Sequence, residues 1–234
     1  MPNSNPQRST IRTLTFGCAM AVAVLSLALA VAQTPPAEWD GLQQRPSRAV
    51  DLLYARPGAS LEGYQAVRLK PLEVSFDENW NPNRGSRSTN LTATDFQRIK
   101  DALAQEFARV SASELARSGY PIVQRTGPDV LDVQPFIVDL LITAPSTQGA
   151  GRSRTYTANA GRMTLVAELR DSETNTVLFR VVDRRNAAST GTWQLTTNVT
   201  NMGAARQAIQ RWASALRNAL DAANGGPRPR PSSP

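Results

Sequence analysis

Apolar residues recur along this chain with two different periods, and the longer period marks helices. From Thr94 onward, apolar residues follow each other by three or four positions, with polar side chains between them: Phe96, Ile99, Leu103, Phe107 and Val110. This spacing predicts an amphipathic helix. Thr94 or Asp95 is its expected N-cap, and Ser118-Gly119 its expected end.

A second stretch with the helical period lies near the C-terminal end of the chain. Its apolar stripe consists of Ile209, Trp212, Ala213, Leu216 and Leu220. Asn224-Gly225-Gly226 is expected to end this helix. Residues 225–234, which are rich in proline and arginine, are expected to form a disordered tail.

The shorter period, typical of strands, is clearest in residues 161–185. Met163, Leu165, Ala167 and Leu169 lie on one face of a predicted strand, and Val177, Phe179 and Val181 can oppose them on the next. The connection DSETNT places Asn175 where a left-handed backbone is needed, so the stretch predicts a β-hairpin. Further strands are expected at 66–74, 120–123 and 129–143. Pro135 should mark an edge or a bulge.

The order of strand, helix, several strands and helix predicts an α+β domain, a largely antiparallel sheet with two amphipathic helices packed on one face. The domain is assigned to residues 49–224, after an extended lead-in at 33–48. Polar connections at 77–90 and 144–160 are expected to be surface loops. One core should hold Leu103, Phe107, Leu165, Phe179, Ile209, Trp212 and Leu216.

The N-terminal segment predicts export. Arg8 and Arg12 precede an apolar run at 14–32 that ends in Ala30-Val31-Ala32, as in a secretory signal peptide. Cleavage after residue 32 would leave the protein periplasmic or secreted. Cys18 lies near the start of the apolar run and not at its end, so the geometry disfavours lipidation. Membrane anchoring remains the alternative, if the segment is retained or Cys18 is lipidated.

Beyond residue 32 the chain contains no cysteine and no histidine. This composition excludes disulfides and thiolate or imidazole metal sites, and it excludes Ser-His-Asp and Cys-His nucleophiles. No cofactor is expected. The formal net charge is +7, but the arginines form no block and the aromatic residues do not interleave with them. Nucleic-acid binding is therefore not expected.

Carboxylates are the remaining candidates for catalysis, and they define an alternative function as a hydrolase of envelope saccharide. Asp77 and Glu78 lie beside Trp80, and a second acid would have to come from Asp139 or Asp171. Adjacent acids on an extended chain point to opposite sides. The same parity argument separates Asp132 from Asp139, so the sequence favours solvated acids over a catalytic pair.

Five segments together carry a family resemblance: WDGL (39–42), RPGASLEGYQAVRLKPLEVSFDENW (56–80), SGYPIVQRTGPDVLDVQPFIVDL (118–140), AGRMTLVAELRDSETNTVLFRVVD (160–183) and WASALRNALD (212–221). Their order and spacing resemble the bacterial domain-of-unknown-function 3313 family (DUF3313) of exported, often lipid-anchored envelope proteins. The resemblance implies a fold and an envelope location, and it brings no activity or catalytic residue. Cys18 departs from the lipoprotein pattern.

The expected function is therefore a non-enzymatic exported domain that binds another component of the cell envelope. Loops on a rigid scaffold commonly carry binding function, and the two long connections hold Arg84, Arg87, Arg152 and Arg154 together with Trp80. These side chains predict a positive surface for an envelope protein, a wall polymer or an anionic lipid. The alternative is that the arginines only keep the domain soluble. Trp39 and Trp193 are further contact candidates.

Overall fold

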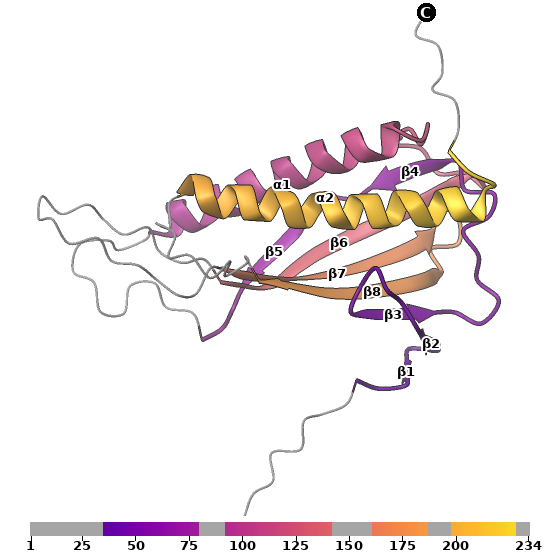
Figure 1. Cartoon of the computed structure of the whole chain (residues 1–234), viewed down its shortest axis with the longest axis horizontal. Helices are drawn as coiled ribbons and strands as arrows, with labels where there is room; N and C mark the ends of the chain where they lie inside the picture. Colours follow the sequence, from indigo (N-terminus) through magenta and orange to yellow (C-terminus); the bar gives the residue numbers. More distant parts are fainter. Residues whose placement is uncertain (1–34, 80–91, 142–160, 187–197, 228–234) are drawn as a thin grey trace, which may run out of the picture. The chain divides into compact units, whose positions relative to one another are not determined.

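The computed structural model describes residues 35–79, 92–141, 161–186 and 198–227 (Figure 1). The chain divides into two units, 1–35 and 36–234, and all the described elements belong to the second. The predicted signal segment lies outside the described residues, as does the tail from residue 228 onward. None of the helices in the described ranges has the length and apolarity that crossing a bilayer needs.

The predicted α+β class is confirmed. The elements run in the order β1 (Glu38–Trp39), β2 (Leu42–Arg45), β3 (Leu52–Ala55), β4 (Ala66–Leu69), β5 (Glu73–Phe76), α1 (Ala93–Ala116), β6 (Val130–Leu141), β7 (Arg162–Asp171), β8 (Val177–Asn186) and α2 (Asn198–Ala223). One sheet has the strand order β1-β2-β3-β8-β7-β6-β4, and β5 also pairs with β6. Only β4 and β5 run parallel to their neighbour β6.

Both helices pack on the same face of this sheet (Figure 1). Met163, Leu165 and Ala167 share one face of β7, and they join a buried cluster with Phe107 of α1 and Ile209 of α2. The helices run in the same direction, since Glu106 pairs with Arg206 while Glu114 bonds residues further along α2. The opposite face of the sheet carries no helix of the described chain.

The predicted single core is divided into two clusters. One contains Leu103, Phe107, Leu165, Ile209 and Trp212, whereas Phe179 and Leu216 pack against the other. Leu69 packs against both. The first cluster lies where β5 ends and β7 begins, and the second lies where β6 begins and β7 ends.

The predicted strand at 66–74 is interrupted in the middle. β4 pairs with β6 from Val130 to Val133, and β5 pairs with it again from Phe136. Pro135 is buried between these two stretches of β6, where no parallel partner requires its missing N–H. Residues 120–123 contribute only an isolated bridge between Ile122 and Val67.

Helix α1 begins earlier than its apolar pattern indicates. Thr92 is the N-cap, and its hydroxyl accepts a hydrogen bond from the Asp95 backbone N–H while the Asp95 carboxylate accepts one from the Thr92 N–H. The predicted cap at Thr94 or Asp95 is therefore wrong by position, because this capping box lies before the first apolar residue. Helix α2 ends as predicted, with Gly225 at φ 81° and Gly226 at φ 118°.

The predicted hairpin at 161–185 is confirmed as β7 and β8. Leu169 faces Phe179 and Ala167 faces Val181 across the pair. Asn175 adopts φ 58°, the left-handed conformation that the turn requires.

The sheet also begins earlier than the predicted domain start at residue 49. Strands β1 and β2 fall within the segment expected to be an extended lead-in, and they form a hairpin through Asp40 and Gly41, both at positive φ. Such a two-residue turn is typical of type I′ hairpins.

Candidate functional site

The site residues predicted from the sequence lie outside the described residues. Trp80, Arg84 and Arg87 belong to segment 80–91, Arg152 and Arg154 to segment 142–160, and Trp193 to segment 187–197. The described elements nevertheless fix where each segment leaves and rejoins the domain.

All three segments start and finish at one end of the sheet, here called the loop end. Phe76 at the end of β5 pairs with Leu140, and Leu141 at the end of β6 pairs with Arg162 at the start of β7. Arg162 in turn pairs with Asn186 at the end of β8. Phe96 in the first turn of α1 contacts Phe76, with ring centroids 5.2 Å apart. The described residues that flank the three segments therefore lie at a common end of the domain.

The carboxylates proposed for hydrolysis are separated. Asp77 pairs with Arg162, the first residue of β7, whereas Asp171 is the last residue of that ten-residue strand. A strand of this length spans about 30 Å, so Asp171 is too far away to be the second acid that the alternative hydrolase hypothesis would need beside Asp77. Asp139 lies near Asp77 on a bulge of β6, at φ 53°. Asp132 is buried nine residues before the end of β6, and Asp139 lies seven residues further along the same strand.

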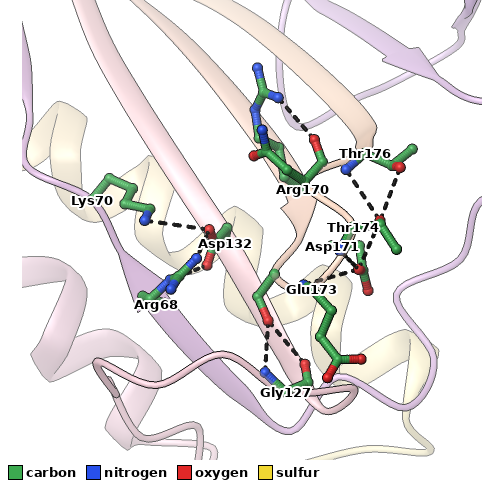
Figure 2. Close-up of polar contacts among 11 residues, drawn as sticks. Arg68, Lys70, Gly127, Asp132, Arg170, Asp171, Glu173, Thr174 and Thr176 are labelled. Atoms are coloured by element: carbon green, nitrogen blue, oxygen red, sulfur yellow. Dashed lines mark hydrogen bonds and ion pairs between the residues drawn. The ribbon is translucent and has the colours of Figure 1, made fainter.

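A row of charged side chains crosses the sheet on the face opposite the helices, and we call it the charged row. It begins on β4, where Arg68 Nε donates to Asp132 Oδ1 of β6 at 2.6 Å and Lys70 Nζ lies 3.6 Å from Oδ2 (Figure 2). Arg170 of β7 stands opposite Asp132 in the register. From there the row continues through Glu168 of β7 and Arg180 of β8 to Asp40 of the β1–β2 turn.

Of the inner members of the row, Asp132 and Arg180 are buried and Glu168 and Arg170 are partly buried, and opposite charges pair along it. Glu168 accepts hydrogen bonds from Arg170 and, at 2.7 Å, from Arg180 Nη2. Burial raises the pKa of Glu168, but the bonds from Arg180 and Arg170 outweigh this and hold the pKa below its ordinary value. An acid kept ionised in this way suits an ion pair and not a proton donor.

The β1–β2 hairpin curls over one end of the row. The Trp39 ring lies 4.1 Å from the Arg180 guanidinium carbon and meets Tyr54 edge-on at 5.7 Å. Arg180 also donates to Asp40 at 2.8 Å. Trp39 keeps 38% of its surface exposed, the highest among the large apolar side chains of the described residues. It is therefore a rigidly held aromatic side chain with an accessible surface.

The other end of the sheet, here called the closed end, is tied by buried side chains. Ser172 donates to the Gly127 carbonyl at 2.9 Å and accepts from its N–H at 3.0 Å (Figure 2). Asp171 accepts from the Thr174 N–H at 2.8 Å and from the Tyr64 hydroxyl at 2.9 Å. Burial and then this bond to Asp171 raise the pKa of Tyr64. These contacts connect three loops without bringing two free acids together.

The family follows from comparison of the sequence. The model of the DUF3313 family, described as a protein of unknown function, matches residues 33–216. The chain belongs to the DUF3313 family. No curated protein matches the sequence.

Solved structures give distant likenesses to this DUF3313 chain. A PelC dodecamer from Paraburkholderia phytofirmans is 12% identical, with 69% of this chain and 96% of that chain covered and a TM-score of 0.36. Protein XCC0632 from Xanthomonas campestris is 15% identical, with 70% and 86% covered and a TM-score of 0.32. The hypothetical protein CT253 from Chlamydia trachomatis is 13% identical, with 67% and 98% covered and a TM-score of 0.34.

The charged row is the main polar feature that the sequence patterns did not reveal. Its members occupy alternate positions of strands whose other face is apolar. On β7, for example, Glu168 and Arg170 alternate with the buried Ala167 and Leu169. That alternation was available in the sequence, but it does not show which strands become neighbours. Among the described residues, no group of three or more acidic side chains is arranged to hold a metal ion.

Proposed function

We propose that this DUF3313 protein is a non-enzymatic domain of the cell envelope that binds an anionic envelope component through its loop end. The observation that carries the proposal is the common origin of segments 80–91, 142–160 and 187–197 at this end. Together the three segments contain four arginines and no acidic residue. Positive charge from separate parts of the chain is thus tethered at one place.

The aromatic content of the same segments also fits a contact surface. They contain Trp80, Trp193 and Tyr156. Tryptophan, tyrosine and arginine are enriched among residues that dominate binding energy. An anionic lipid headgroup, a wall polymer and an acidic protein share the negative charge that such a surface would recognise.

The polar contacts of the described carboxylates favour binding over hydrolysis. Asp77 pairs with Arg162, Asp132 with Arg68, and Glu168 with Arg180. A general acid needs a raised pKa, whereas the pKa of Glu168 is lowered. These contacts support a role of the acids in the fold and its surface charge.

The proposal predicts salt-sensitive retention on anionic material. Protein recovered from cells that express the full chain is sedimented with phosphatidylglycerol vesicles, phosphatidylcholine vesicles and purified wall sacculi over a range of salt concentrations. Exchange of Arg84, Arg87, Arg152 and Arg154 for Ser should abolish most of the retention on the anionic material that binds. Added salt should do the same, because exposed charges are screened within about 10 Å at 0.1 M salt.

A matched control removes the same number of positive charges at positions away from the loop end. The pair Arg152→Ser and Arg154→Ser is compared with Arg125→Ser and Arg211→Ser, which are exposed arginines of the described chain away from the loop end. Only the first pair should weaken retention. Equal retention of all variants would show that the arginines of the loop end do not bind the anionic material. Release of soluble saccharide from sacculi, lost on Asp77→Asn, would favour a hydrolase instead.

A further inference from the structure

The sheet face opposite the helices combines the charged row with an apolar row. Phe136, Val166, Val182 and Leu52 stand in register across β6, β7, β8 and β3, directly beside the charged row. Each is only partly buried. In the part of the chain that the structure describes, only the β1–β2 hairpin folds over this face. A row of partly exposed apolar residues on a face without a covering helix can form a contact surface.

The edges of the sheet are poorly suited to pairing with another chain. β1 has only two residues and follows Pro35 and Pro36, and Pro71 precedes β5. The outer side of β4 already bonds to residues 121 and 123. Proline and short strands are common protections of sheet edges. A protein partner would therefore meet the face of the sheet and not its edge.

The order of charges along the row identifies the partner. From β4 to the hairpin the signs alternate, in the order Arg68, Asp132, Arg170, Glu168, Arg180 and Asp40. The row starts with a positive charge and ends with a negative one. If a second copy of the row is laid against it in the opposite direction, its negative end lies against the positive end of the first. The exposed positive end of one row, at Lys70, then meets the exposed negative end of the other, at Asp40.

We propose that this face is the contact surface between two copies of the chain, related by a two-fold axis that crosses the charged row at right angles between Arg170 and Glu168. The axis reverses the row, so Lys70 and Arg68 of one copy lie against Asp40 of the other. An axis along the row would place like charges together, so the charge order selects one arrangement. Two-fold axes are the most common symmetry of soluble oligomers.

The size of the face is compatible with such a dimer. β7 and β8 have ten residues each and β6 has twelve. With about 3.3 Å per residue and about 4.8 Å between strands, these strands and β3 span on the order of 600 Å². Standard interfaces bury about 800 Å² per partner. The apolar rows would pack between the two sheets, as in β-sandwiches.

The ends of the row provide the test, because they are its most exposed members. The side chain of Lys70 is 39% exposed and that of Asp40 is 67% exposed, whereas Asp132 is only 5% exposed. The oligomeric state is measured by sedimentation velocity and by light scattering on protein recovered from cells that express the full chain. The expected result for the unmodified protein is a dimer. Lys70→Glu alone and Asp40→Lys alone should each weaken dimerisation at least about tenfold, since each places like charges together twice.

Reciprocal rescue distinguishes a variant that has lost this interface from one that has failed to fold. Mixing the Lys70→Glu variant with the Asp40→Lys variant should restore a dimer, because both contacts between unlike copies become attractive. The double variant should also dimerise. Arg211→Glu and Glu62→Lys are matched reversals at exposed positions off this face and should leave the dimer unchanged. A monomeric unmodified protein, or a dimer indifferent to Lys70→Glu, would overturn the proposal. The inference is independent of the loop end, so retention on anionic material does not bear on it.

Discussion

The two ends of the sheet differ in the contacts that the described residues make there. At the closed end, Asn224 accepts from the Gly63 N–H at 2.9 Å and donates to the carbonyls of Leu61 and Leu220. Ser172 and Asp171 tie two more connections there. At the loop end, the strands finish in ion pairs such as Asp77–Arg162, and three segments of eleven to nineteen residues leave the sheet.

Each end also has its own apolar cluster. The cluster at the loop end contains Trp212, and the cluster at the closed end contains Tyr120 and Leu220. The loop end is therefore supported by a full core beneath it. A sheet end from which long polar segments start can therefore still have a well-packed core. The residues that stabilise the fold are then different from those that we propose for binding.

The largest expected effect is at the core of the loop end. Trp212 is buried, and its indole N–H donates to Asp183 at 2.6 Å. Trp212→Ala should lower the free energy of unfolding by about 3–5 kcal/mol through the cavity that it leaves. Denaturant titration measures this, and Trp212→Phe separates packing from the lost hydrogen bond. A cost below about 1 kcal/mol would mean that the stripe of α2 does not form the core.

The closed end should respond through hydrogen bonds. Asn224→Ala leaves the Gly63 N–H and the Leu61 carbonyl without their side-chain partner. We expect a loss of about 0.5–1.5 kcal/mol, the usual net contribution of a hydrogen bond, because these bonds are exposed or partly buried. Hydrogen exchange should show faster exchange around residues 61–64 while the Trp212 cluster stays protected. Unchanged exchange there would show that the closed end does not depend on Asn224.

Acid should weaken both ends in a defined window. Bonds from Arg109 and Arg206 lower the pKa of Glu106 from its ordinary value of 4.5 to about 2, and the pKa values of Glu168 and Asp171 are also lowered. Groups with a lowered pKa in the folded state stabilise it above their unfolded pKa, and this contribution is lost as the pH falls through the folded pKa. The free energy of unfolding should fall from about pH 4.5 toward pH 2, and Glu168→Gln should make the decline shallower.

The smallest expected effect is on the stability of the proposed binding segments. Exchange of Arg84, Arg87, Arg152 and Arg154 for Ser should change the free energy of unfolding by less than about 0.5 kcal/mol, as is usual for substitutions away from the core. Thermal and denaturant unfolding check this. A larger loss would mean that these arginines support the fold, and the retention experiment would then need single variants.

Local patterns predicted local structure well. The three- and four-residue spacing located both helices, and Asn175 located the β7–β8 turn at its left-handed residue. The same patterns failed where the bounds of a strand depend on a pairing partner that is distant in the sequence. Residues 66–74 form two strands because they pair with two separate stretches of β6, one before and one after Pro135, more than sixty positions away in the sequence.

The candidate sites were harder to predict for the same reason. Four arginines in two segments were selected by charge, but only the pairing of β5, β6 and β7 places the ends of these segments together. The charged row needs neighbours from β4 and from the β1–β2 hairpin, which are far from β7 in the sequence. The β1–β2 hairpin itself was missed because its eight residues contain few apolar positions, so the Asp40-Gly41 turn was its one local indicator.

The pairing of β3 with β8 has a consequence for how the protein folds. Leu52 pairs with Val182, so the first three strands cannot join the sheet until nearly the whole domain has been synthesised. Proteins rich in such long-range pairings fold slowly, because the loop must close before the contact can form. The β7–β8 hairpin can form early, as its strands are adjacent. The N-terminal strands can therefore dock only onto a β8 that has already been made, nearly 130 residues after β3.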